Sequence, residues 1–172
     1  MKLTFNMKTH NILSIEDFKT NIIKNSRLLG IDPGNKNVGI AICDENQIIA
    51  TPFKTIQRNK FEELLTELKE IIIDNNIMGI VVGNPINMDG SKGKSSQSAA
   101  DFCKNLSNNI TIPITLWDER LSSEGSFKIT KDLDTNTSKK VKNLDKNAAA
   151  FILKVLLIIC LINACIESYK GL

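Results

Sequence analysis

Apolar residues along this chain fall into short blocks, and their spacing predicts the order of its secondary structure. The first three blocks, near residues 27–31, 37–43 and 48–53, have the length and composition of strands. The connections between them, at 35–37 and 44–46, are short and rich in turn-forming residues. We therefore expect these three strands to form an antiparallel meander.

Helical spacing follows the meander. An amphipathic helix over 60–75 is predicted by the recurrence of Phe61, Leu64, Leu65, Leu68, Ile71 and Ile72. Residues 80–82 form a short apolar strand, Ala99 to Leu106 carry a second helical pattern, and 112–117 is the next strand. Strands that alternate with helices are usually parallel and joined by crossovers. The pattern predicts an α/β fold in which helices flank one mixed, five-stranded sheet.

Carboxylates stand at the ends of two predicted strands and at the start of a late apolar segment. Asp32 precedes a Pro-Gly turn, Asp118 and Glu119 follow a strand, and Asp145 precedes a run of alanines. Each also has a structural interpretation, because aspartate forms Asx turns and caps helices. Adjacent strand residues point to opposite faces, so we expect only one of Asp118 and Glu119 at a shared site.

Four strings contain these acids or lie between them: Arg27 to Ala41, Val81 to Ser91, Asp118 to Ser123, and Asp145 to Leu153. In this order and spacing they closely resemble the YqgF/RuvX family, small RNase H-like proteins related to the Holliday-junction resolvase RuvC. The resemblance implies an RNase H-like nuclease domain over 27–168, preceded by an N-terminal extension over 1–26. One departure is Asn37, which stands where the family often has a basic residue.

In such a fold, Asp32, Glu119 and Asp145 would converge at one edge of the sheet, and the resemblance selects Glu119 over Asp118. Carboxylates brought close together repel one another unless cations neutralise them. Mg²⁺, or Mn²⁺ in its place, suits oxygen ligands and keeps waters for a substrate phosphate. Two such ions about 4 Å apart can activate water and stabilise the leaving oxygen of a phosphodiester. These three acids are therefore the expected catalytic residues and metal ligands.

Basic residues near the acids are candidate nucleic-acid contacts: Lys92, Lys94, Arg120, Lys139, Lys140 and Lys142. Each has a plainer alternative, since loop 87–95 can be solvated, Arg120 can form a structural salt bridge, and a lysine run is often a solvated face. A P-loop is excluded because Met88 stands where its first glycine is required. Trp117 and Phe127 are too few for a base-stacking platform.

The composition of the chain argues against several classes of catalytic and metal site. The chain has 172 residues, 42% hydrophobic and 24% charged, with a net charge of +3, which is typical of one soluble globular domain. His10 is its single histidine, which disfavours a His-based triad or zinc site. Cys43, Cys103, Cys160 and Cys165 show no Cys-x-x-Cys spacing, so we expect reduced thiols in a cytoplasmic protein.

The two ends of the chain raise the questions of secretion and of a membrane span. Residues 1–26 hold no continuous apolar stretch for a signal-peptide core and are expected to be partly helical. The apolar run 148–162 is broken by Lys154 and is shorter than the about 20 residues of a spanning helix. We expect a buried last helix with no membrane contact, and its apolar surface permits a homodimer without requiring one.

These observations lead to a metal-dependent endonuclease. The resemblance implies two substrates, the 5′ end of pre-16S rRNA in ribosome biogenesis or the DNA four-way junction in recombination and repair. The rRNA role comes first, although no residue separates the two. Two other functions stay open. A non-catalytic nucleic-acid-binding module could keep this fold, and Asp32-Pro33-Gly34 with Gly39 also fits an actin-like phosphate-binding lobe, which would need a second lobe.

Overall fold

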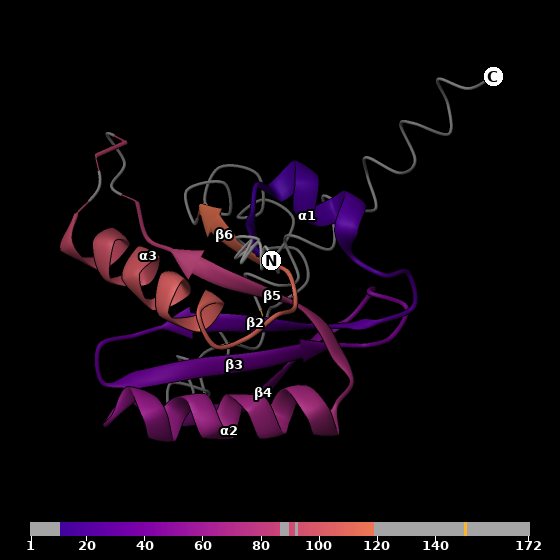
Figure 1. Cartoon of the computed structure of the whole chain (residues 1–172), viewed down its shortest axis with the longest axis horizontal. Helices are drawn as coiled ribbons and strands as arrows, with labels where there is room; N and C mark the ends of the chain where they lie inside the picture. Colours follow the sequence, from indigo (N-terminus) through magenta and orange to yellow (C-terminus); the bar gives the residue numbers. More distant parts are fainter. Residues whose placement is uncertain (1–10, 87–89, 92, 119–149, 151–172) are drawn as a thin grey trace, which may run out of the picture.

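The computed structural model describes residues 11–86, 90–91, 93–118 and 150, and the fold is given for these residues (Figure 1). Six strands form one sheet in the order β1-β6-β5-β2-β3-β4. The strands are β1 (Ile12–Leu13), β2 (Arg27–Pro33), β3 (Asn37–Cys43), β4 (Ala50–Gln57), β5 (Ile77–Asn84) and β6 (Ile114–Asp118). The helices are α1 (Ile15–Asn21), α2 (Phe61–Asp74) and α3 (Lys94–Ser107).

The predicted fold class is confirmed. Strands β2, β3 and β4 form the antiparallel meander, while β5 pairs parallel with β2 and β6 pairs parallel with β5. The meander's last strand begins later than predicted, because Ile48 and Ile49 belong to the turn. Their backbone N–H groups donate to the Asp44 carboxylate at 2.8 and 2.6 Å. These bonds stabilise the charged carboxylate and hold the pKa of Asp44 below its ordinary value, and the bond from Ile49 has the largest effect.

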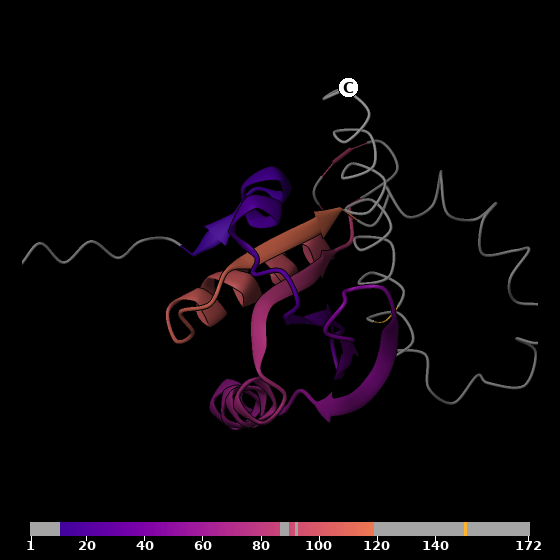
Figure 2. The same ribbon diagram turned by 90° about the vertical axis from the view of Figure 1, so that its right-hand side faces the viewer.

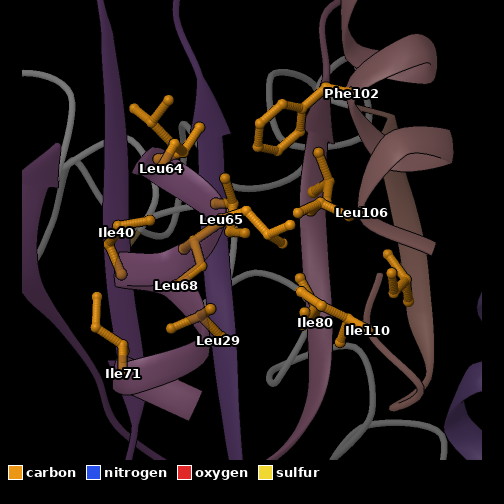
Figure 3. Packing of buried hydrophobic residues seen from close by; sticks show 14 of the residues in the cluster. Leu29, Ile40, Leu64, Leu65, Leu68, Ile71, Ile80, Phe102, Leu106 and Ile110 are labelled. Carbon is orange, nitrogen blue, oxygen red and sulfur yellow. The ribbon is translucent and has the colours of Figure 1, made fainter. Parts of the chain in front are cut away.

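Helices α2 and α3 cover one face of the sheet, called here the helix face. Leu64, Leu68 and Leu106 of these helices pack on strand residues such as Leu29 and Ile80, in one apolar cluster (Figure 3). Side chains alternate along a strand, so the next residues point to the other face. Leu28, Val81 and Trp117 accordingly belong to a second, smaller cluster on what we call the opposite face.

The sheet contains a sixth strand that the sequence did not predict. Strand β1 pairs parallel with β6, with Ile12 opposite Ile114, and Figure 2 shows β1 and α1 beside β6. Phe18 of α1 is fully buried in the opposite-face cluster. Residues 11–26 thus include a helix, as expected, but they also complete the packed fold. The domain boundary at residue 27 stays a prediction.

Two further sequence expectations can be examined in this part of the chain. Cys43 and Cys103 are buried free thiols, as predicted, whereas Cys160 and Cys165 lie outside the described residues. Among the helices described, none is long and apolar enough to cross a membrane. The apolar run 148–162, on which the prediction of a last helix rested, lies outside the described residues except for Ala150, which is buried.

Candidate active site

Three parallel strands bring polar side chains to one end of the sheet. Ile31 of β2 pairs with Val82 of β5, so Asp32 lies near the end of β5. Asn84, the last residue of β5, is the register partner of Asp118, the last residue of β6. Ligands of open α/β sheets bind beyond the carboxyl ends of the strands. Asp32, Asn84 and Asp118 therefore mark the candidate site at this end.

The turn after Asp32 is tightly held. The Gly34 N–H donates to the Asp32 carbonyl at 3.0 Å, and a Cβ on Gly34 would lie 2.5 Å from the Asn37 carbonyl oxygen, so that only glycine fits. Arg58, just after β4, fastens the turn from outside. Its Nη1 donates to the Gly34 carbonyl at 3.2 Å, and its backbone N–H donates to Lys36 at 2.8 Å. These bonds fix the backbone that carries Asp32.

The two described aspartates of the site lie on opposite faces of the sheet. Along β2, Asp32 alternates with Ile31 of the helix-face cluster, so it lies on the opposite face with Leu28. Along β6, Trp117 belongs to the opposite-face cluster, which places Asp118 on the helix face. The strand geometry thus separates Asp118 from Asp32.

Asn84 shares the helix face with Asp118 and has a buried partner. The Ser96 hydroxyl of α3 donates to Asn84 Oδ1 at 2.8 Å, and Ser96 is only 2% exposed. Sequence reasoning used Asn84 for the resemblance but did not include it among the site residues. The sequence signal that could have identified Asn84 as a site residue is its position at the end of a predicted strand, directly before a proline. The bond fastens the end of β5 to the first turn of α3.

The other predicted site residues are described only in part. Lys94 is the first residue of α3 and is exposed. Seven predicted residues lie outside the described residues: Lys92, Glu119, Arg120, Lys139, Lys140, Lys142 and Asp145. Within the described ranges, no three His, Cys, Asp or Glu side chains are grouped to hold a metal. The Asp32 carboxylate, half-buried at a strand end, has the hard oxygen donors that Mg²⁺ prefers. The three-acid site stays a prediction.

Similarity to known proteins adds to this geometry. A family model described as "RuvX: Holliday junction resolvase" matches residues 26–158, most of the chain. The chain belongs to the RuvX family. This agrees with the RNase H-like fold class expected from the sequence, and by family the chain is a nuclease, that is, a hydrolase.

Individual relatives extend the comparison. A protein of Pelagibacter ubique named "Putative pre-16S rRNA nuclease" is 55% identical over 143 residues, 83% of this chain and 95% of the relative. A protein of the same name from Cereibacter sphaeroides is 40% identical, over 82% of this chain and 88% of its own. Among solved structures, T. thermophilus RuvC in complex with a Holliday junction substrate is 11% identical with a TM-score of 0.49. The structural match covers 75% of this chain and 90% of the RuvC chain.

Proposed function

We propose that this chain is a metal-dependent endonuclease that hydrolyses phosphodiester bonds in maturing the 5′ end of pre-16S rRNA, in the cytoplasm. The observation that carries the proposal is Asp32, held by a fixed turn at the carboxyl end of a central strand. Family membership and the names of the relatives support the reaction class and the RNA substrate.

The proposed metal ligands are Asp32, Glu119 and Asp145, with Mg²⁺ or Mn²⁺ as the cation. The described part of β6 supports the choice of Glu119 over its neighbour, because Asp118 lies on the face away from Asp32. When bound, the metal supplies an activated water and stabilises the leaving oxygen. The contribution of Asp32 is a negative charge held at a constant position by the turn at Gly34 and Arg58.

A second candidate is resolution of DNA four-way junctions. The observation in its favour is the description of the matching family model, a Holliday junction resolvase. Symmetric cleavage of a junction requires two copies of the chain related by a two-fold axis. The RNA role does not impose that requirement.

One experiment compares the two substrates directly. Purified full-length protein is incubated with a transcript carrying the 5′ leader of 16S rRNA and, separately, with a synthetic four-way DNA junction. Each reaction contains Mg²⁺ or Mn²⁺, with EDTA as the control. Cleavage confined to the leader supports the rRNA role, and paired symmetric cuts in the junction support the second candidate. Absence of cleavage of both substrates would contradict the nuclease proposal.

A further inference from the structure

A groove lies between α2 and α3, on the face of the sheet away from Asp32. Its volume is about 520 Å³, within the range of pockets that hold small ligands. Helix α2 follows β4, whose last residue Gln57 pairs with Asn37 beside the Asp32 turn, and α3 follows β5. Both helices therefore begin at the end of the sheet that carries the candidate site. The groove lies on the helix face, whereas Asp32 lies on the opposite face.

The base of the groove is aromatic. Phe61 of α2 and Phe102 of α3 meet edge to face, with ring centroids 6.2 Å apart. The Arg58 guanidinium lies over Phe102, 5.5 Å from the ring centroid, in a cation–π contact. Figure 3 shows Phe102 and Leu64, another groove residue, at one end of the helix-face cluster. Phe102 is only 2% exposed, so the surfaces open to a ligand are the half-buried Phe61 ring and the Arg58 guanidinium that lies over Phe102.

The walls of the groove are polar and carry more positive than negative charge. Lys94, Gln97 and Asn105 follow one side of α3, and Arg58 stands across from them. The lining carboxylate, Asp101, accepts a hydrogen bond from Gln97 Nε2 at 3.0 Å. In the described part of the chain, Arg58 and Lys94 form no ion pair with a carboxylate. Two cationic side chains thus line the groove and suit an anionic ligand.

We propose that this groove binds one unpaired nucleotide of the nucleic-acid strand on which the chain acts. Arg58 and Lys94 suit a phosphate, and the guanidinium together with Phe61 suits a stacked base. The amides of Gln97 and Asn105 can donate to and accept from a base edge. An apolar ligand would leave these polar groups without partners. The inference rests on the proposed function, because it adds a second contact with the same substrate.

Arg58 connects the groove to the candidate site. The side chain that lies over Phe102 also donates from Nη1 to the Gly34 carbonyl, in the turn after Asp32. A nucleotide that contacts Arg58 thus contacts the residue that fastens the Asp32 turn. Arg58 is accordingly a positioning residue as well as a ligand-binding one. Sequence reasoning missed it because a lone arginine between a strand and a helix has no distinctive pattern.

Binding measured without metal tests the groove separately from cleavage. The probe is a short, fluorescein-labelled single-stranded RNA in EDTA, and thermal unfolding checks that each variant is folded. Combining Gln97→Ala with Asn105→Ala should weaken binding about tenfold, because contacts to the base edge are lost. Lys94→Ala should flatten the slope of log affinity against log salt by about 0.7. Lys104→Ala, an exposed lysine of α3 outside the groove lining, is the control and should change neither quantity.

Two further measurements define failure. An RNA carrying 5-iodouridine should cross-link to Phe61, and duplex RNA of the same sequence should bind the double variant as well as it binds wild type. Unchanged single-strand affinity in the groove variants, cross-links confined to other peptides, or equal losses with duplex RNA would each overturn the inference. None of these results depends on metal or cleavage, so they leave the nuclease assay as an independent test of the proposed function.

Discussion

The two faces of the sheet differ in how far apart in the chain their packed residues lie. The helix-face cluster is made of residues 29–114, in which strands and helices follow one another closely. The opposite-face cluster joins Phe18 of α1, Trp117 of β6 and Ala150 to central strand residues. Asp32 lies on this second face. Asp32 therefore lies on the face whose packing depends on segments far apart in the sequence.

The largest expected effect concerns the end of the sheet, where one aspartate lies on each face. Asp32→Asn removes a charge that the proposed metal site needs while keeping nearly the same shape. We expect cleavage to fall by orders of magnitude, with the thermal unfolding midpoint and nucleic-acid binding largely retained. Asp118→Asn, the matched change on the helix face, should keep most of the activity. Full activity of Asp32→Asn, or equal losses in the two variants, would contradict this placement.

The second prediction tests whether the opposite face needs the N-terminal segment. Phe18 is fully buried, and its replacement by alanine should lower the free energy of unfolding by about 3–5 kcal/mol. Phe53 of β4 is 47% exposed and provides a control, since Phe53→Ala should change stability by less than about 1 kcal/mol. Urea denaturation measures both. A loss for Phe18→Ala as small as the loss for Phe53→Ala would mean that α1 contributes little to the fold.

Sequence reasoning succeeded where the pattern was local. The meander, α2 and α3 followed from turn residues and from apolar spacing such as that of Leu64 and Leu68. It missed β1 because two residues, Ile12 and Leu13, are too short a run to indicate a strand. Their pairing with β6 depends on contacts about a hundred residues away, including the bond from the Thr115 hydroxyl to the Leu13 carbonyl at 3.1 Å.

The candidate site was predictable to a similar extent. Asp32 stood out because a turn directly follows a strand, and its place at the sheet end agrees with that expectation. Strand alternation predicted that only one of Asp118 and Glu119 would reach the shared site, and the resemblance selected Glu119. The membership of Trp117 in the opposite-face cluster, which periodicity alone does not supply, then separates Asp118 from Asp32. Arg58 and the groove depend on two helices lying on one face, a property of the assembled fold.

The third prediction concerns Gly79 of β5, which lies against the N-terminal segment. A Cβ at this position would lie 2.9 Å from the Phe18 ring and 3.0 Å from Leu28 Cδ2. Gly79→Ala should therefore destabilise the protein by about 1–3 kcal/mol, the usual effect of overpacking. In the Phe18→Ala background the added methyl group has room, so its cost should be much smaller. An additive double-mutant cycle would contradict this contact.

The smallest predicted effect compares one buried thiol on each face. Burial raises the pKa of Cys43, on the opposite face, from 9.0 to about 11, and that of Cys103, on the helix face, to about 12. Above about pH 9 the unfolded thiol loses its proton while the folded thiol keeps it, so stability falls as pH rises. Each thiol should contribute about 1 kcal/mol of loss between about pH 8 and pH 10.

The test is urea denaturation of Cys43→Ala and Cys103→Ala at both pH values, because only the difference from wild type isolates one thiol among the groups that titrate there. Each variant should lose less stability than wild type on raising the pH, whatever its stability at pH 8. Both folded-state pKa values lie above this interval, so the two variants should retain the same extra stability relative to wild type at pH 10. That result would mean that the opposite face excludes water as well as the helix face does. A gain confined to Cys103→Ala would instead mean that Cys43 ionises in the folded protein and that the opposite face admits water.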